Sequence, residues 1–309
     1  MIYKPKTKVL KILIAGASGF VGKALKEELQ KNGHEVFTLV RDQKLVSSHA
    51  FFWDPAHFQL PKDLTPYENL DACINLSGEN ISSGRWTKLK KEKILKSRLD
   101  ATHALVALFS SVKSPPSLFI NASAIGFYGE RGGEILTENS SPGRNFLADV
   151  CTKWEKAAAP LEKLPVRMIY LRIAPVLAKT GGALSKMLLP FKLGLGGKLG
   201  SGEQYFSFIS LKDLIRIVLF ILKEEQIEGV VNAASPYPLR NKDFTKILAK
   251  SLHRPAFFTV PAFAARLLLG QMADELLLVS ARAYPKKLID NNFYFEYPTA
   301  QSIFNDCLN

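Results

Sequence analysis

The sequence predicts an α/β fold in which a Rossmann-type, doubly wound parallel sheet carries a smaller, mostly helical C-terminal substrate region. Three observations predict it. Apolar strand-like runs alternate with helix-like runs through the first two thirds of the 309 residues. A glycine-rich turn joins the first run to the first helix-like stretch. Helix-like segments punctuated by proline dominate residues 236–309.

The first element is the apolar run 9–15, and the glycine-rich turn 16–22 follows it directly. A helix-like stretch covers 23–31, and a second strand-like run covers 35–40. Glycines at such a turn allow a tight change of direction, the approach of a pyrophosphate and close packing of helix on strand. The helix N-terminus adds N–H groups that favour an anion. This order predicts a dinucleotide site, whereas the alternative is a tight turn without a ligand. The turn residues assigned to the cofactor are Gly16, Ser18, Gly19, Phe20, Val21 and Gly22.

The end of the second strand indicates which dinucleotide binds. In proteins that bind NAD, an acidic residue usually stands there and holds the ribose 2′-hydroxyl. Here Arg41 stands there, and a guanidinium can form a forked contact with a 2′-phosphate. We therefore expect NADP rather than NAD. Two alternatives stay open, because Asp42 beside it would suit NAD and Arg41 would also suit an ordinary surface position.

The later elements continue the alternation. They are a short aromatic run at 50–54, a strand at 71–76, a basic helix at about 87–111, a strand at 117–123, a helix at about 145–164 and a strand at 166–173. Ligands bind at the carboxyl ends of the strands in such sheets. The residues that should border the cofactor there are Asn75, Leu76, Ser77, Gly78 and Ser123.

The same pattern suggests how the chain is divided. We expect a nucleotide-binding domain over residues 8–177, completed by a helix and a strand at about 211–234. Residues 178–210 and 235–309 should form the substrate or capping region. Glycine and lysine dominate 178–209, which predicts a long loop that covers a site or, alternatively, a mobile surface loop.

Composition and charge limit the classes of function that this protein can have. The net charge of +13 would suit a nucleic acid or a membrane surface. Much of that charge lies in 88–98, a segment typical of the solvated face of a helix, and no nucleic-acid motif accompanies it. The three cysteines are far apart and the five histidines lack ligand spacing, so we expect no disulfide framework, no metal and a reducing cytoplasm. We also expect no signal peptide and no membrane span.

Several motifs resemble those of extended short-chain dehydrogenases/reductases. The segments that show this resemblance are the turn 16–22, the strand end 75–78 and the segment 121–129 with Phe127-Tyr128-Gly129. A narrower resemblance to the atypical epimerase-like branch labelled 39U1 rests on motifs spread over nearly the whole chain. These are Gly78-Glu79-Asn80-Ile81, Ser97-Arg98, residues 122–129, Leu171-Arg172-Ile173, the glycine-rich 194–202 and Pro285-Lys286-Lys287-Leu288. The resemblance implies NAD(P) binding, epimerase or reductase activity and a family-specific C-terminal domain.

The acid/base pair that this resemblance implies is missing. The superfamily uses a serine with Tyr-x-x-x-Lys, in which the lysine lowers the tyrosine pKa and the tyrosine moves the proton while nicotinamide moves hydride. No tyrosine in this sequence has a lysine four residues later. Glu155 aligns with the glutamate that commonly follows the lysine by four, which places Leu147 at the tyrosine and Cys151 at the lysine.

Four residues remain as candidates for the chemistry. Ser123 stands where the superfamily keeps its hydroxyl, or it only caps a turn. Tyr128 is expected to face the nicotinamide as a catalytic or substrate-binding hydroxyl, or it only packs or bonds a ribose. Cys151 is a candidate nucleophile or a small buried residue. Arg172 would bind an anionic group of the substrate or form a structural ion pair.

The resulting interpretation is an NADP-binding, epimerase- or reductase-like oxidoreductase with a non-standard acid/base. Its substrate is a small polar or nucleotide-sugar-like molecule that the sequence does not identify. The alternative is a non-catalytic NADP-binding sensor or regulatory protein, which the loss of the Tyr-Lys pair favours. We expect a cytoplasmic monomer or homodimer that meets a small-molecule substrate and neither a membrane nor a nucleic acid.

Overall fold

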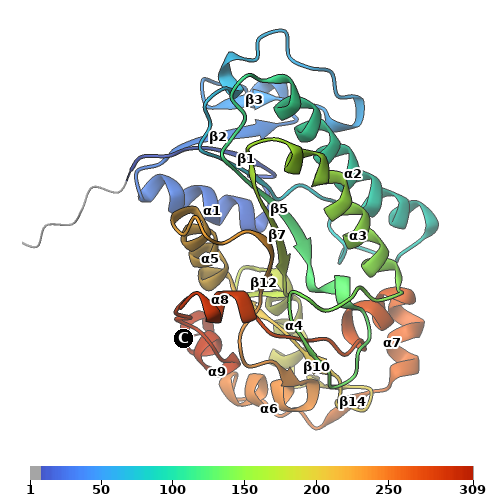
Figure 1. Ribbon diagram of the computed structural model, residues 1–309. Helices are drawn as coiled ribbons and strands as arrows, with labels where there is room; N and C mark the ends of the chain where they lie inside the picture. The colour runs from blue at the N-terminus through green and yellow to red at the C-terminus, as the bar shows by residue number, and fades with distance from the viewer. Residues whose placement is uncertain (1–7, 309) are drawn as a thin grey trace, which may run out of the picture.

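A seven-stranded sheet forms the centre of the molecule in the computed structural model, which describes residues 8–308 (Figure 1). The strand order is β12-β7-β5-β4-β1-β2-β3, and every pair of neighbours is parallel. The strands are β1 (Lys11–Ala15), β2 (Glu35–Val40), β3 (Ala50–Phe52), β4 (Ala72–Asn75), β5 (Leu118–Ala124), β7 (Arg167–Ile173) and β12 (Gly229–Ala233). The order changes direction between β1 and β4, which confirms the doubly wound α/β sheet and marks the point where such sheets bind ligands.

Helices cover both faces of this sheet (Figure 1). One pair consists of α1 (Phe20–Lys31) and α5 (Leu211–Lys223), and the other of α2 (Lys88–Ser111) and α3 (Phe146–Ala158). Successive side chains of a strand point to opposite faces. In β1, accordingly, Ile12 and Ile14 join the core beneath α1 and α5, whereas Leu13 joins the core beneath α2.

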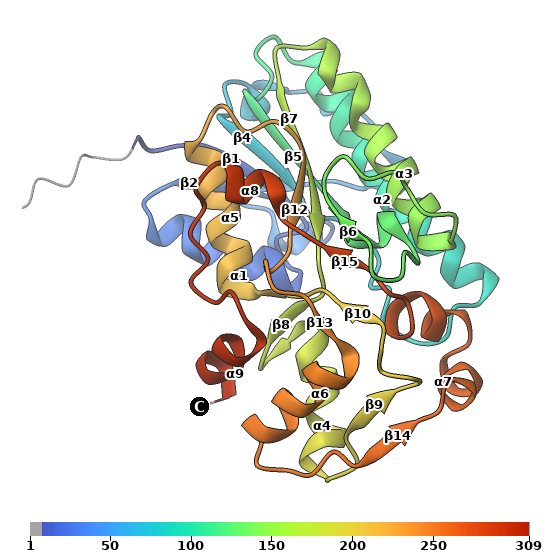
Figure 2. The same ribbon diagram turned by 60° about the horizontal axis from the view of Figure 1, so that its bottom comes forward.

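Most of the C-terminal region gathers at one end of the sheet (Figure 2). The helices there are α4 (Gly182–Lys192), α6 (Asn241–Ser251), α7 (Ala262–Leu269) and α9 (Ala300–Leu308), whereas α8 (Lys286–Asp290) lies against the edge strand β12. Short two-stranded sheets pair β8 (Val176–Ala178) with β11 (Ile209–Ser210), β9 (Gly197–Leu199) with β14 (Phe258–Val260), β10 (Tyr205–Phe206) with β13 (Leu239–Arg240), and β6 (Ile135–Leu136) with β15 (Arg282–Ala283). A separate apolar core around Phe208, Phe244 and Phe304 holds much of this region together.

Two expectations for this region were wrong. The segment 178–209 is not a long loop, because it contains α4 and several short strands. Leu184, Leu188 and Phe191 bury one face of α4 at helical spacing, which the many glycines and lysines nearby had masked. Within 236–309, which we expected to be mostly helical, residues 273–283 instead contain a turn of π-helix at Ala273–Leu277 and then β15. Residue 309, the last of the expected capping region, lies outside the described residues.

Three general features concern the described residues alone. No helix within 8–308 is both long and apolar enough to cross a bilayer. In the same part of the chain, no cluster of three or more histidine, cysteine or acidic side chains is arranged to hold a metal ion. Cys73, Cys151 and Cys307 all carry free thiols.

Candidate functional site

The glycine-rich turn lies between the carboxyl ends of β1 and β4. Gly16 has φ +85°, and a Cβ there would lie 2.8 Å from the carbonyl carbon of Leu76. A Cβ at Gly22 would lie 2.2 Å from the carbonyl oxygen of Gly16. These two glycines are therefore required by the packing of the turn itself. Gly19 differs, because it is extended and exposed, and a Cβ there would meet only the Gly16 oxygen, at 3.3 Å.

The N-terminus of α1 is arranged to receive an anion. Gly19 caps the helix without a side-chain hydrogen bond, and the first turn carries no acidic residue. The first N–H groups of a helix lack partners within it and carry a partial positive charge. Ser77, whose backbone N is 3.0 Å from the Cβ position of Gly16, adds a hydroxyl to this place. Its Oγ is the one buried side-chain polar atom without a hydrogen-bond partner among the described residues. The open turn, the helix end and this hydroxyl fit the pyrophosphate of a dinucleotide.

The end of β2 presents Arg41 and Asp42 at the surface, and both are exposed. The Asp42 carboxylate accepts a hydrogen bond from the backbone N–H of Lys44 at 2.9 Å and so caps the turn Gln43–Leu45. This contact gives Asp42 a structural role at the position where an NAD site would use an acid.

The structure buries Asn75, which we expected to border the cofactor. Its Nδ2 donates to Asn121 Oδ1 at 2.8 Å and to Thr102 Oγ1 at 3.1 Å, while its Oδ1 accepts from the Ser77 backbone N–H at 3.2 Å. The side chain therefore joins β4 to β5 and α2 and is closed to a ligand. Ser77 and Gly78 beyond it remain at the edge of the site.

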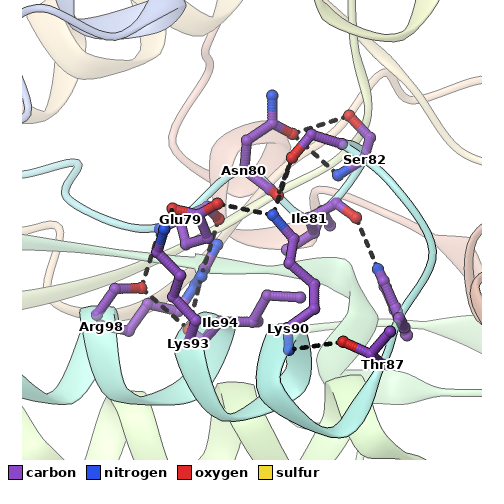
Figure 3. A network of polar contacts seen from close by, with 12 residues as sticks. Glu79, Asn80, Ile81, Ser82, Thr87, Lys90, Lys93, Ile94 and Arg98 are labelled. Carbon is purple, nitrogen blue, oxygen red and sulfur yellow. Dashed lines mark hydrogen bonds and ion pairs between the residues drawn. The ribbon is translucent and has the colours of Figure 1, made fainter.

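The loop after β4 is fixed to the first turns of α2 by a polar network (Figure 3). The Glu79 carboxylate accepts from Lys90 Nζ at 2.7 Å, and Lys93 Nζ lies 3.7 Å from its other oxygen. The hydrogen bond from Lys90 holds the pKa of Glu79 below its usual value. The backbone N–H of Glu79 donates to Ser97 Oγ at 2.9 Å. Part of the basic segment thus faces this loop rather than solvent, and it keeps the loop in one position beside the glycine turn.

Ser123 lies near the carboxyl end of β5 and points at a buried carboxylate. Its Oγ donates to Glu155 Oε1 on α3 at 2.6 Å. Arg172 on β7 donates through Nε to the same oxygen and through Nη2 to Glu155 Oε2, both at 2.9 Å. The side chains of Arg172 and Glu155 are only 4% and 13% exposed. Burial alone would lower the pKa of Arg172, but the hydrogen bonds and charge of Glu155 raise it above its usual value.

Of the two alternatives for Arg172, the geometry supports a structural ion pair with Glu155, and the side chain is not placed to bind an anionic substrate. Its guanidinium carbon also lies 3.3 Å from the centroid of the Phe127 ring. A side chain enclosed by a carboxylate and an aromatic face has its charge already compensated.

The Tyr128 hydroxyl, which we expected to face the nicotinamide, points into the protein interior. The residue is 0% exposed. Its hydroxyl accepts from Arg172 Nη1 at 3.1 Å and lies 2.7 Å from Asn232 Oδ1 and 2.9 Å from the Thr137 carbonyl oxygen. Burial raises the pKa of Tyr128, although Arg172 opposes this shift. Because the residue is fully buried and three protein groups enclose its hydroxyl, the geometry gives Tyr128 a structural role.

The two positions that replace the tyrosine and lysine are apolar or neutral. Leu147 packs in a cluster with Trp86, Ile94 and Val150. Cys151 is buried beside Ser123, and burial, reinforced by the charge of Glu155, raises its pKa to about 11. The thiol is therefore protonated near neutral pH, and the geometry does not support a nucleophilic role for it.

Three contributors were missed by the sequence reasoning. In the sequence analysis Glu155 was used only to align α3 with the superfamily motif, yet its carboxylate accepts the hydrogen bond from Ser123. Arg98 was noted only as part of a motif and lies against Gly78. Glu275 accepts from the backbone N–H groups of Phe146 at 3.3 Å and Leu147 at 2.8 Å, and so caps α3 from the C-terminal region. No local signal reveals Glu275, because it is 128 residues away from Leu147 in sequence.

Comparisons with known proteins agree with this geometry. The profile of the NAD dependent epimerase/dehydratase family matches residues 12–234, and a domain of unknown function, DUF1731, matches residues 260–307. An epimerase family protein from Mycobacterium leprae is 36% identical over 288 residues, which cover 93% of this chain and 92% of that protein. A relative from Staphylococcus saprophyticus is also 36% identical, over 95% of this chain and 98% of its own.

Two solved structures are similar over almost the whole chain. The human epimerase family protein SDR39U1, crystallised with NADPH, is 30% identical with a TM-score of 0.86, over 96% of this chain and 99% of that one. A nucleoside-diphosphate sugar epimerase from Corynebacterium glutamicum is 35% identical with a TM-score of 0.80, over 97% of this chain and 58% of that one. On the evidence of its sheet, its glycine turn and these matches, the chain belongs to the NAD-dependent epimerase/dehydratase family.

Proposed function

We propose that this protein is an NADP-dependent oxidoreductase of the epimerase or reductase type, in which Ser123 and Glu155 replace the tyrosine and lysine as the proton-handling groups. The observation that carries this proposal is the 2.6 Å hydrogen bond from Ser123 Oγ to Glu155 Oε1. It lies near the carboxyl end of β5, on the side of the sheet where the glycine turn and the Ser77 hydroxyl fit a dinucleotide.

In this mechanism the protein orients the substrate and moves one proton. A bound nicotinamide would exchange hydride with a carbon of the substrate. Ser123 Oγ would accept the proton of a substrate hydroxyl while its own proton passes to Glu155; in the carbonyl-reducing direction both transfers reverse. Arg172 holds both oxygens of Glu155 and so fixes the acceptor for Ser123. Leu147 keeps water away from one side of α3 by packing against Trp86.

The substrate that suits this chemistry is a small polar carbonyl or alcohol compound, including nucleotide-sugar-like molecules. The similar structure from Corynebacterium glutamicum is named a nucleoside-diphosphate sugar epimerase, and this name supports the nucleotide-sugar class of substrate. The setting we propose is a cytoplasmic monomer or homodimer. The test is to mix the protein with NADPH and carbonyl compounds, or with NADP and nucleotide sugars, and to follow the absorbance of the reduced nicotinamide. Turnover above the protein-free rate supports the proposal.

A second candidate is a non-catalytic NADP-binding sensor or regulatory protein. The packing of Leu147 at the tyrosine position favours it, because the cluster closes that position to proton transfer. If the protein binds NADPH tightly but none of the tested carbonyl compounds or nucleotide sugars changes the nicotinamide absorbance, the result favours the sensor over the enzyme.

Arg41 should make the protein prefer NADP over NAD. The guanidinium is exposed at the end of β2, and a 2′-phosphate there would gain a charge-assisted contact. Arg41→Ala should remove most of the affinity gap, about 1–3 kcal/mol, with NAD binding little changed. Titration calorimetry with both dinucleotides measures the gap, and Lys62→Ala, another surface cation, is a control for general charge. Equal affinities in the unmodified protein would refute the preference.

Gly19→Ala should weaken both dinucleotides while leaving the fold stable. Within the protein its Cβ meets only the Gly16 carbonyl oxygen, at 3.3 Å, a close contact that a small shift relieves, but it occupies the approach of the pyrophosphate. We expect a loss of about ten- to a hundredfold in affinity. Gly22→Ala is the contrasting variant, because its Cβ at 2.2 Å from the Gly16 oxygen must distort the turn and lower the melting temperature. Unchanged affinity in Gly19→Ala would place the pyrophosphate elsewhere.

A further inference from the structure

We propose that Arg98 supplies the positive charge that the missing lysine would provide, and that its guanidinium binds the ribose between the pyrophosphate and the nicotinamide. This inference rests on the dinucleotide binding proposed above. It assigns a binding residue to the half of the cofactor that reacts.

The first argument is the place of Arg98 between two elements of the site. Its side chain leaves α2, and Nη1 donates to the carbonyl oxygens of Ile94 at 2.8 Å and Glu79 at 3.2 Å. A Cβ on Gly78 would lie only 3.0 Å from the guanidinium carbon, so the side chain lies directly on the loop after β4 (Figure 3). On its other side, the guanidinium carbon is 5.0 Å from the centroid of the Trp154 ring on α3.

The second argument is its relation to the lysine position. Cys151 takes that position on α3, and Trp154 stands three residues later, on the same side of the helix. Arg98 and Cys151 lie close enough for the charge of each to shift the pKa of the other. The neutral thiol cannot replace an ammonium group, whereas the guanidinium beside it carries a permanent charge.

The third argument is that this cation is incompletely satisfied. In the part of the chain that the structure describes, its partners are two carbonyl oxygens and an aromatic face, and no carboxylate is paired with it. The nearby Glu79 carboxylate is bound by Lys90 and Lys93 instead. A guanidinium has five N–H donors, so Nε and Nη2 remain available for a ligand.

The position of these donors points to the ribose. The pyrophosphate fits the N-terminus of α1 beside Gly16 and Ser77. The proposed function puts the reacting ring at the Ser123 hydroxyl. Arg98 lies between these two places, against Gly78 and near Cys151, the neighbour of Ser123. The part of the dinucleotide that joins pyrophosphate to nicotinamide is a ribose, whose hydroxyl oxygens accept hydrogen bonds from a fork of N–H groups.

The experiment compares three ligands that differ by one piece each: NADP, 2′-phospho-ADP-ribose, which lacks the nicotinamide, and 2′-phospho-ADP, which also lacks the second ribose. Titration calorimetry with Arg98→Met should show affinities for the first two reduced by about ten- to a hundredfold. The affinity for 2′-phospho-ADP should change by no more than about twofold, because that ligand does not reach Arg98. Arg98→Lys should keep part of the affinity, and Lys96→Met on the same helix, 66% exposed, is the matched control.

Each outcome decides between explanations. An equal loss for all three ligands overturns the proposal and makes Arg98 a support of the loop or a pyrophosphate contact. No loss for any ligand overturns it as well. If Arg98→Met does not fold, Arg98→Gln keeps a polar side chain on α2 while removing the charge and the fork of donors. The same selective loss there supports the proposal, and unchanged binding overturns it. Failure of the unmodified protein to bind any of the three ligands contradicts the proposed function itself, which is a separate result.

Discussion

Glu155→Gln should lower the free energy of unfolding by about 3–5 kcal/mol, because it leaves the buried charge of Arg172 without its counter-charge. Arg172 is 4% exposed and gives two hydrogen bonds to the Glu155 carboxylate. A neutral amide keeps the shape of the side chain but has one acceptor oxygen instead of two. Urea denaturation, followed by circular dichroism, measures the difference.

Two control variants test this explanation. Asp149→Asn removes an ion pair with Lys153 on the same helix, where both side chains are about half exposed, and should cost less than about 1 kcal/mol. The double variant Glu155→Leu, Arg172→Met removes both charges and should recover part of the loss, since apolar groups can replace a buried pair. A cost below 1 kcal/mol for Glu155→Gln alone would show that Arg172 finds other compensation.

Ser123→Ala should reduce turnover by about 10²- to 10⁴-fold, the range expected for losing a group that transfers a proton. The measurement uses whichever substrate changes the nicotinamide absorbance. Tyr128→Phe is the matched comparison, because it also removes one hydroxyl near Arg172. It should cost about 1–3 kcal/mol of stability, because Arg172 Nη1 and Asn232 Oδ1 each lose their hydrogen bond to the Tyr128 hydroxyl, and it should change turnover little. Turnover lost in Tyr128→Phe and kept in Ser123→Ala, with both proteins folded, would reverse the assignment.

Local patterns were sufficient to predict most of the fold. The alternation of strands and helices, and the turn at 16–22, depend on residues that are neighbours in the chain, so the sequence displays them directly. The positions of Ser123 and Cys151 also followed from one helix and one strand. The α4 helix was missed because its buried positions are few and lie among glycines and lysines.

The site was harder to predict because its contacts join distant segments. Sequence alone could not choose between a ligand role and an ion pair for Arg172, since the choice depends on how α3 faces β7. Tyr128 follows β5 by a few residues, and nothing local shows that its hydroxyl turns inward to Asn232, 104 residues later. Burial decided both cases, and burial is a property of the assembled layers.

The strand order has a consequence for the time at which this site is completed during synthesis. β12 is the last strand of the central sheet to leave the ribosome, yet it pairs along β7 and brings Asn232 to the Tyr128 hydroxyl. Until residues 229–233 emerge, a nascent chain holds β7 as an open edge, and Tyr128 and Arg172 lack the last member of their hydrogen-bonded group. The β7 edge therefore stays unpaired until the intervening residues 178–228 and then β12 have been synthesised, and an unpaired edge strand can pair with another chain.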